Sequence, residues 1–436
     1  MQDPTRRTLL KSAAAAAAIH SSRSPILGAN DRINIAVVGV GGRGTAHVRE
    51  YLNIADVHIA AIVDVNQEAQ ERAQATVKKA KGHDPKTYSD MRKAFADKGI
   101  DAVSIATPNH WHVLTALWAV QAGKDVYVEK PVSHNIFEGQ QLLAAARKYG
   151  KIVQVGQQSR STPHKMKAMK LLEEGVIGKL YMAKGLCYKR RKSIGRQPDQ
   201  PTPPGIDWDI FLGPAPMRPF NANRFKYNWH WFWDTGNGDI GNQGVHEMDV
   251  ALWGLGKKVF PKSVMSMGGK FVYDDDQETP NTQIASFDFG DGTELQFEVR
   301  GLITTEEGGL KLRGGNVVGN LFYGADGVMA VDSAGFQVWK GENRELIMEE
   351  KSERGDSEGH FANFVKAVKS RKVEDLNCDV AVGHNSAAFC HMANISYRLG
   401  RRLTVDPAKQ NFMGDADANR MLTRKYRAPY VVPEKV

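Results

Sequence analysis

The chain has 436 residues, 42% of them hydrophobic and 25% charged, and its formal net charge is +9. A chain of this length can bury two hydrophobic cores, so we expect two domains. Beyond the N-terminus no stretch approaches roughly eighteen apolar residues, and the basic residues form no long tract, which argues against a stable membrane anchor and against nucleic-acid binding. The cysteines are far apart and odd in number, which argues against a disulfide framework and against a metal site.

Residues 1–30 have the pattern of an export signal. Arg6 and Arg7 precede an alanine run at 13–18, a combination typical of twin-arginine signals. The run is too short and too weakly apolar to anchor the chain in a membrane. We therefore predict that the twin-arginine translocation machinery exports the protein to the periplasm or beyond. The alternative is a disordered basic N-terminus followed by a frayed helix.

A glycine-rich turn follows the first apolar strand of the chain. The strand is expected at 33–38, and the sequence Gly-Val-Gly-Gly-Arg-Gly comes directly after it. In such turns the first glycine allows a tight bend, the second lets a pyrophosphate approach the backbone, and the third lets the next helix lie close to the sheet. Free N–H groups at the start of that helix favour phosphate binding. The residues predicted to contact the dinucleotide here are Gly39, Gly41, Gly42, Arg43 and Gly44.

An acidic residue completes this pattern. A second apolar strand at 57–63 is followed directly by Asp64. A carboxylate at this position can accept hydrogen bonds from both hydroxyls of the adenosine ribose, and its charge repels the 2′-phosphate of NADP. The sequence therefore predicts NAD rather than NADP as the cofactor.

Strands and helices alternate through residues 31–157, which predicts an NAD-binding Rossmann domain with a doubly wound parallel sheet. The five expected strands are 33–39, 57–64, 101–106, 125–129 and 151–156. Ligands of such a sheet bind beyond the carboxyl ends of the strands.

Two groups of polar residues follow strands of this domain, at the edge where the nicotinamide half of NAD is expected. The first group, after the strand at 101–106, is Thr107, Pro108, Asn109 and His112. The second, after the strand at 125–129, is Glu129 and Lys130. We predict that both groups contact the cofactor. Lys130 can also bind a sugar hydroxyl, and it can act as an acid or base if partial burial lowers its pKa. Alternatively, its Lys-Pro pair forms only a turn.

The pattern changes in residues 158–436, which we expect to form a C-terminal α+β domain with an open, mostly antiparallel sheet. Alternating stretches are found at 179–188, 262–273, 281–289, 293–300, 310–323 and 328–339. Helices are expected near 163–174, 357–370 and 380–399.

Three features of this domain can bear chemistry. A glycine-rich loop leads into a helix that is expected to present Asn242, His246 and Asp249 on one face, although His246 is equally compatible with a core position. Trp231 belongs to a dense aromatic cluster at 229–233, which suits either sugar rings or a packed core. The basic run at 189–192 is either a solvated loop edge or an anion-binding lip over a substrate cleft.

Together these motifs resemble the Gfo/Idh/MocA family of oxidoreductases. The resemblance covers about residues 31–400 and includes Thr-Pro-Asn-x-x-His at 107–112, Glu-Lys-Pro at 129–131, Asp-Trp-x-x-Phe-Leu-Gly-Pro-Ala-Pro at 207–216 and Gly-x-His-x-x-Asp at 244–249. It implies a Rossmann domain joined to an open-faced sheet that commonly serves in oligomer contacts, so a homo-oligomer is expected. It also implies a sugar, polyol or glycoside bound between Lys130 and the helix that bears His246.

The chain departs from the family pattern at Asn242, where dehydrogenases of the family often have an aspartate four residues before the histidine. Either Lys130 and His246 divide the proton transfer, or the reaction is not a simple alcohol oxidation. Some exported relatives are NAD-dependent glycoside hydrolases that oxidise a ring hydroxyl, eliminate the glycosidic group, add water and reduce again.

Three hypotheses follow. The first is an exported NAD-dependent oxidoreductase acting on a CH–OH group of a carbohydrate. The second is a redox-neutral glycoside hydrolase with tightly bound NAD, and the third is a non-catalytic sugar-binding protein that contains NAD. The first two assign catalysis to Lys130 and His246. Substrate binding is assigned to Lys130, Trp231, Asn242 and His246.

Overall fold

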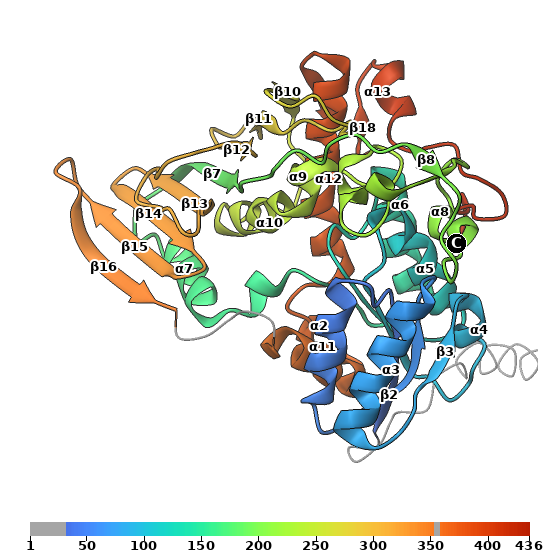
Figure 1. The fold of residues 1–436 in the computed structure, drawn as a ribbon. Helices are drawn as coiled ribbons and strands as arrows, with labels where there is room; N and C mark the ends of the chain where they lie inside the picture. Colours follow the sequence, from blue (N-terminus) through green and yellow to red (C-terminus); the bar gives the residue numbers. More distant parts are fainter. Residues whose placement is uncertain (1–31, 353–357) are drawn as a thin grey trace, which may run out of the picture.

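The computed structural model describes residues 32–352 and 358–436. The predicted export signal at 1–30 therefore lies outside the described residues. Within the described ranges no helix is both long and apolar enough to cross a membrane. The chain forms an α/β unit at its N-terminal end and a second unit built on a large sheet (Figure 1).

The first sheet has six parallel strands in the order β3-β2-β1-β4-β5-β6. Its strands are β1 (Ile33–Val38), β2 (Val57–Val63), β3 (Lys86–Tyr88), β4 (Ala102–Ile105), β5 (Asp125–Val128) and β6 (Val153–Val155). The helices between them are α2 (Arg43–Leu52), α3 (Gln67–Lys81), α4 (Met91–Phe95), α5 (Asn109–Gln121) and α6 (Ile136–Lys148). The doubly wound prediction is confirmed, and the strand order reverses between β1 and β4, where ligands bind in such sheets. Sequence reasoning missed β3, a short edge strand.

The second sheet has ten strands in the order β16-β15-β14-β13-β7-β12-β11-β10-β17-β18. Of their pairings only β7 with β12 is parallel, so the expected mostly antiparallel sheet is confirmed. The long strands are β7 (Leu180–Tyr188), β10 (Ser263–Gly269), β11 (Thr282–Asp288), β12 (Glu294–Arg300) and β13 (Val317–Gly324). The others are β14 (Gly327–Asp332), β15 (Gly335–Lys340), β16 (Glu345–Lys351), β17 (Leu403–Asp406) and β18 (Asn411–Phe412).

Two strand predictions need correction. The stretch expected as one strand at 328–339 is a hairpin of β14 and β15, because the chain turns between Asp332 and Gly335, whose φ is +148°. The strand expected at 310–323 begins only at Val317. Sequence reasoning also missed β16, β17 and β18.

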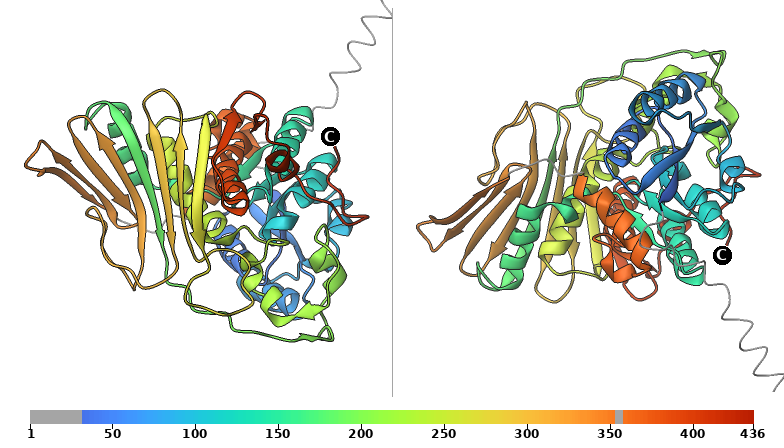
Figure 2. Two further views of the ribbon diagram at one scale, coloured as in Figure 1. Left: turned by 90° about the horizontal axis from the view of Figure 1, so that it is seen from above. Right: turned by 90° about the horizontal axis from the view of Figure 1, so that it is seen from below.

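One face of the ten-stranded sheet carries helices and the other does not (Figure 2). The covering helices are α7 (Pro163–Glu173), α10 (Gly244–Gly254) and α12 (Val380–Leu399). Helix α11 (Glu358–Ser370) follows this sheet in the chain but packs on the first domain, where Phe361 and Phe364 join the core beside β1 and β2. The two domains are thus joined by the packing of α11 as well as by the chain that continues from β6.

A long segment between β7 and α9 (Gly238–Asn242) crosses back over the first domain, and we call residues 193–231 the strap. It contains β8 (Asp199–Gln200), α8 (Trp208–Leu212) and β9 (Phe220–Asn221). The strap pairs with the backbone directly after β2: Gln67 donates its N–H to the Gly205 carbonyl at 2.9 Å, and Asp207 donates to Val65 at 2.9 Å. Figure 1 shows β8 and α8 at the edge of the molecule, above α4 and β3.

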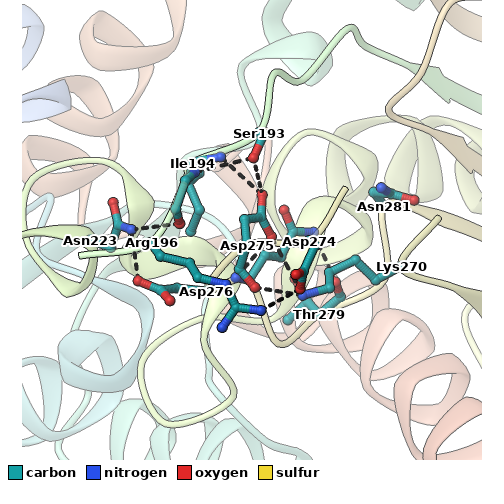
Figure 3. Close-up of polar contacts among 12 residues, drawn as sticks. Ser193, Ile194, Arg196, Asn223, Lys270, Asp274, Asp275, Asp276, Thr279 and Asn281 are labelled. Carbon is teal, nitrogen blue, oxygen red and sulfur yellow. Dashed lines mark hydrogen bonds and ion pairs between the residues drawn. The ribbon is translucent and has the colours of Figure 1, made fainter. Parts of the chain in front are cut away.

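Three consecutive aspartates contact the strap, and two of them, Asp275 and Asp276, bind it through less exposed hydrogen bonds (Figure 3). Asp275 accepts hydrogen bonds from the Ser193 hydroxyl at 2.8 Å and from the Ile194 N–H at 3.0 Å. Asp276 accepts from the Asn223 side chain at 3.0 Å, and Asp274 pairs with Arg196 at the surface. The strap is therefore fastened to the second domain at this end and to the first domain near Val65.

Candidate active site

A cavity of about 710 Å³ lies between the first domain and the strap. Its cofactor half is lined mainly by residues at the carboxyl ends of β1, β2, β4 and β5. Its substrate half consists of Lys130 and the lining residues from the second domain and the strap. Those residues are Gln158, Lys189, Tyr227, Trp229, His230, Asn242, Gln243 and His246, whereas Phe211, Phe225 and Lys226 of the strap lie over the cofactor half, near Val65.

The glycine turn has the shape that a dinucleotide requires. Gly39 has a φ of +83°, and a Cβ atom there would lie 2.8 Å from the backbone of Ala106. A Cβ on Gly44 would lie 1.9 Å from the Gly39 carbonyl oxygen, so Gly44 packs behind the turn and does not line the cavity. Gly41 and Gly42 instead face space, with no atom nearer than 3.9 Å to a Cβ built there. The backbone is thus open on the side where a pyrophosphate would bind.

Asp64 lies at the wall of the cofactor half and is oriented by the backbone. Its Oδ2 accepts the Val40 N–H at 2.6 Å, and its Oδ1 accepts the Asn66 N–H at 2.9 Å. Burial raises the pKa of Asp64, and these hydrogen bonds act in the opposite direction. A carboxylate has about four lone-pair sites, so it retains acceptors for ribose hydroxyls.

The residues after β4 connect the cofactor half to its surroundings. His112 bridges two loops, with Nε2 at 2.8 Å from the Thr107 carbonyl and Nδ1 at 2.6 Å from the Pro131 carbonyl. Asn109 donates to Asn237 of the second domain at 2.9 Å. Thr107, Pro108, Asn109 and His112 all line the cavity, and the buried Thr107 hydroxyl has no protein partner. That unpartnered hydroxyl is consistent with a ligand at this position.

Glu129 is an ionised anchor rather than a proton acceptor. Its carboxylate accepts hydrogen bonds from Arg43 Nε, His47 Nε2 and Gln158 Nε2, each at 3.0 Å. Burial favours the neutral acid, but Arg43, His47 and Lys130 hold the pKa of Glu129 well below its usual range. Arg43 therefore links the glycine turn to the loop that carries Lys130.

Lys130 projects from the end of β5 toward the second domain. Its Nζ donates to the backbone carbonyl of Asn242 at 2.9 Å and lies 3.4 Å from Asn242 Oδ1. Burial lowers the pKa of Lys130; Glu129 opposes this shift, whereas Arg43 and Lys189 add to it. A lysine with a lowered pKa can exchange a proton with a substrate more readily than an ordinary one.

The structure explains the asparagine at position 242. Asn242 Nδ2 donates to the Tyr227 hydroxyl at 2.9 Å and lies 3.5 Å from Asp239 Oδ1. Arg191 holds Asp239 with two hydrogen bonds, of 2.8 and 2.7 Å. The amide therefore turns its NH₂ group to the acid and its oxygen to Lys130. A carboxylate beside this cavity is thus present, one turn earlier in the chain, but it is occupied by Arg191.

His246 comes from the first turn of α10 and lines the same cavity as Lys130. Burial and the nearby Lys130 hold the pKa of His246 well below its usual value, so the imidazole is neutral near pH 7. Its buried Nδ1 has no protein partner. The predicted pair of Lys130 and His246 is therefore brought together in one cavity, with one ring nitrogen of the histidine unused by the protein.

Besides Gly44, two residues named from sequence do not reach the cavity. Trp231 does not line it, because its ring packs against the Arg191 guanidinium, 5.2 Å from the ring centre, and is 4% exposed. Asp249 was expected on one face with Asn242 and His246, which is wrong: Asp249 pairs with Arg160 at 2.7 Å, away from the cavity wall. The helix breaks at Gln243, between α9 and α10, so the helical spacing is not continuous from Asn242.

Sequence reasoning missed several lining residues of the substrate half. Tyr227, Trp229 and His230 form an aromatic wall, and the rings of Trp229 and His230 stack with centres 3.5 Å apart. The density of aromatic residues indicated the right segment but not which rings face the ligand. Among the described residues no group of three or more histidine, cysteine, aspartate or glutamate side chains is placed to hold a metal ion.

Two family models match the chain. One is described as "Oxidoreductase family, NAD-binding Rossmann fold" and matches residues 33–157. The other, "Oxidoreductase family, C-terminal alpha/beta domain", matches residues 166–297 and 334–432. These matches span the glycine turn, Lys130 and His246. They confirm the expectation of an NAD-binding Rossmann domain.

Individual proteins are similar over parts of the chain. An uncharacterised oxidoreductase, YrbE, of Bacillus subtilis is 32% identical over 178 residues, which are 41% of this chain and 47% of that protein. An alpha-N-acetylgalactosaminidase of Shewanella oneidensis is 26% identical over 152 residues, 34% of this chain and 33% of that protein. The match thus spans less than half the length of each relative.

Among solved structures, the WlbA dehydrogenase of Bordetella pertussis, in complex with NADH and UDP-GlcNAcA, has the same fold. It superposes with a TM-score of 0.63 at 20% identity and covers 86% of this chain and 99% of that one.

Proposed function

The chain belongs to the Gfo/Idh/MocA oxidoreductase family, and from this premise we propose that it is an NAD-dependent oxidoreductase acting on a CH–OH group of a sugar, polyol or glycoside. One observation carries the proposal. Lys130 from the first domain and His246 from the second line one cavity with the glycine turn and Asp64. Proton-transfer groups from two domains thus converge beside a dinucleotide site, as hydride transfer from an alcohol requires.

Each half of the cavity has a separate task in this proposal. Asp64 and the turn at 39–44 bind and orient the cofactor, and NAD when bound supplies the hydride acceptor. The neutral His246 takes the proton of the substrate hydroxyl at its ring nitrogen, and the Lys130 ammonium donates a hydrogen bond to the same oxygen as negative charge develops there. Asn242 fixes the direction of Lys130, and the aromatic wall excludes water and packs on the sugar ring.

The strap supports tight retention of NAD. Phe211, Phe225 and Lys226 of the strap form the outer wall of the cavity. The strap is fixed to α5, because Trp111 Nε1 donates to the Ile210 carbonyl at 2.8 Å. It is also fixed by its backbone pairing beside Asp64 and by the aspartates of Figure 3. Release of a bound dinucleotide would require several of these contacts to open.

A second function is favoured by the similarity to an alpha-N-acetylgalactosaminidase. In this alternative the chain is a redox-neutral glycoside hydrolase that oxidises a ring hydroxyl, eliminates the glycosidic group through the acidified neighbouring C–H, adds water and reduces the ring again. A retained cofactor suits this cycle, since no net oxidation occurs. Asn242 also suits it, because the position lacks the carboxylate of the simple dehydrogenases.

The two functions are separated by one experiment. The purified protein is incubated with a panel of sugars and matching glycosides, and nicotinamide absorbance and released sugar are both followed. An oxidoreductase accumulates NADH without releasing sugar, whereas a hydrolase releases sugar without accumulating NADH. In D₂O the hydrolase also places deuterium on the carbon beside the oxidised one. A protein that binds sugars but does neither would be a sugar-binding protein that contains NAD.

We propose export by the twin-arginine pathway on the basis of Arg6 and Arg7 before the alanine run. That pathway carries folded proteins, so a retained NAD would be exported with the chain. The test is fractionation of cells that produce the wild-type protein or a variant with lysine at both positions. The wild type is expected outside the cytoplasm and the variant inside it. A wild-type protein found in the cytosol would contradict the proposal.

We also propose that the uncovered face of the ten-stranded sheet joins two copies of the chain. Met267 and Ile284 pair across β10 and β11 and are 62% and 49% exposed. Exposed apolar side chains on a broad sheet face commonly mark protein contacts. Light scattering is expected to give at least a dimer, and a monomer at micromolar concentration would contradict this.

A further inference from the structure

The substrate half of the cavity carries positive charge without a matching carboxylate. Lys130 and Lys189 line it, and the third lysine of the cavity, the exposed Lys226, lies toward the residues that follow β2. In the part of the chain that the structure describes, none of the three forms an ion pair with a carboxylate. The acidic residues that line the cavity are Asp64, Glu68 and Glu129, and all three belong to the cofactor half.

Those acids are already engaged. Asp64 accepts backbone N–H groups, Glu68 pairs with Arg72 at 3.0 Å, and Glu129 pairs with Arg43 at 3.0 Å. The carboxylate nearest to Lys189 is that of Glu247, which contacts Gln243 and forms no ion pair with Lys189; burial raises the pKa of Glu247 to about 7, so it offsets the charge of the lysines only in part. Unmatched charge in a partly buried cavity is costly, which favours a ligand of opposite sign.

Lys189 is the best placed of the three lysines to meet such a ligand. Its Nζ donates to Gln243 Oε1 at 2.8 Å. The NH₂ group of Gln243 lies 3.3 Å from Glu247 Oε1, so the amide oxygen is turned toward Lys189. An ammonium has three N–H donors, and this contact uses one of them. Two donors thus remain for a ligand in the cavity.

Lys189 also lies within electrostatic reach of the proposed catalytic lysine. It contributes to the lowered pKa of Lys130, so the two ammonium groups repel each other. The pyrophosphate of NAD does not relieve this, because its expected position is the glycine turn on the first domain. Lys189 instead lies beside Gln243, which directly precedes α10, the helix that bears His246.

We propose that the substrate is an anionic sugar whose carboxylate or phosphate group binds to Lys189. The inference rests on the proposed function of the cavity and adds the charge of the substrate to it. The residues of the basic run at 189–192 then have different roles. Lys189 binds the substrate, Arg191 pairs with Asp239, and Lys192 is exposed to solvent. Of the basic run that was considered as an anion-binding site from sequence, only Lys189 is therefore assigned to the substrate.

The test compares matched neutral and charged sugars. The probes are glucose with glucuronate and glucose 6-phosphate, and galactose with galacturonate and galactose 6-phosphate. Turnover is followed by nicotinamide absorbance, and binding is measured independently by calorimetry on the NAD-loaded protein. At least one charged member is expected to bind and react about tenfold or more better than its neutral parent. Preference for uronates or for sugar phosphates identifies which anion is used.

Two variants distinguish a specific contact of the anion with Lys189 from a general effect of positive charge near the cavity. Lys189→Met is expected to reduce the preference for the charged sugar over its neutral parent about tenfold or more, whereas Lys192→Met leaves that preference unchanged. Higher salt should lower the preference in the wild type. Equal binding of charged and neutral sugars, or an unchanged preference in Lys189→Met, would overturn the inference. Binding of charged sugars without any turnover would instead contradict the proposed function and leave this inference standing.

Discussion

The two halves of the cavity are built in different ways. The cofactor half comes from loops that directly follow β1, β2, β4 and β5, and its geometry is fixed by backbone contacts such as the 2.6 Å bond from Val40 to Asp64. The substrate half is assembled from segments far apart in the sequence. Ion pairs and side-chain amides hold it, among them Arg191 with Asp239 and Asn242 with Lys130. The cofactor half is therefore encoded by short stretches of sequence, whereas the substrate half depends on how the domains meet.

The largest effects are expected from removing the two groups that we propose transfer the proton. Lys130→Ala and His246→Ala should each reduce turnover at least about a hundredfold, about 2.7 kcal/mol of barrier, because positioned acids and bases contribute roughly 10²–10⁴-fold. Steady-state rates measure the loss. Cofactor content and the thermal unfolding midpoint serve as controls and should stay close to wild type. Near-normal turnover in both variants would place the chemistry elsewhere in the cavity.

A substitution in the cofactor half should instead weaken cofactor binding. Asp64→Asn is expected to weaken NAD binding roughly 10- to 100-fold, since it removes a charged acceptor for the ribose hydroxyls, and to narrow the difference between NAD and NADP. Calorimetry with both nucleotides tests this. Asparagine can replace only one of the two oxygens that accept the Val40 and Asn66 N–H groups, so the thermal unfolding midpoint of the variant is the control for the fold of the turn. If NADP already bound more tightly than NAD to the wild type, the assignment of Asp64 would be refuted.

A smaller effect is expected where the strap is fastened. Asp275→Ala removes the acceptor of Ser193 and Ile194 and should speed NAD release about tenfold, because the strap then opens more often. Asp274→Ala is the matched control, since that side chain is 86% exposed and its ion pair with Arg196 lies at the surface, where such pairs contribute little. Stopped-flow displacement of NAD measures the release. Equal release from wild type and Asp275→Ala would show that the strap does not retain the cofactor.

The smallest expected effect is the change of activity with pH. In the proposed mechanism the neutral form of His246 is the active one, so activity should fall only as pH drops through its pKa, which burial holds well below the usual 6.5. The charged form of Lys130 is required, so activity should fall again as pH rises through its pKa, which burial lowers from 10.5. The pH profile of kcat/KM tests both limbs. An acid limb centred at the usual histidine value, with no alkaline limb before 10.5, would disagree with this assignment.

Much of the cofactor half could be predicted because its signals are local. A glycine with a φ of +83° and an acid at the end of β2 leave a pattern within about thirty residues of sequence, as turns of this type do. In the substrate half, single residues were predictable at Lys130, Asn242 and His246, where the family pattern supplied the positions, whereas the aromatic cluster and the basic run at 189–192 were indicated only as segments. The pairing of Lys189 with Gln243 joins residues distant in the chain, and nothing in the local sequence indicates it.

Trp231 shows that a cluster of aromatic residues in the sequence does not reveal which of its rings line the cavity. The aromatic cluster was located correctly, but a short 3₁₀ turn at Asn228–Trp231 decides which rings face the cavity. Trp229 and His230 line it, while Trp231 packs under Arg191. Which ring faces the ligand depends on Arg191 and its partner Asp239, which belong to other segments of the chain.

The central claim is that sugar oxidation occurs on NAD held in this cavity, with Lys130 and His246 moving the proton. The most direct measurement is a single-turnover experiment on protein purified without added nucleotide. The protein is mixed rapidly with the sugars of the panel while the absorbance of reduced nicotinamide is recorded. We expect the absorbance of the wild type to rise by up to one reduced cofactor per cavity, and that of Lys130→Ala to rise at least about a hundredfold more slowly. Cofactor-loaded wild-type protein that binds a sugar of the panel but shows neither reduction nor sugar release would contradict it.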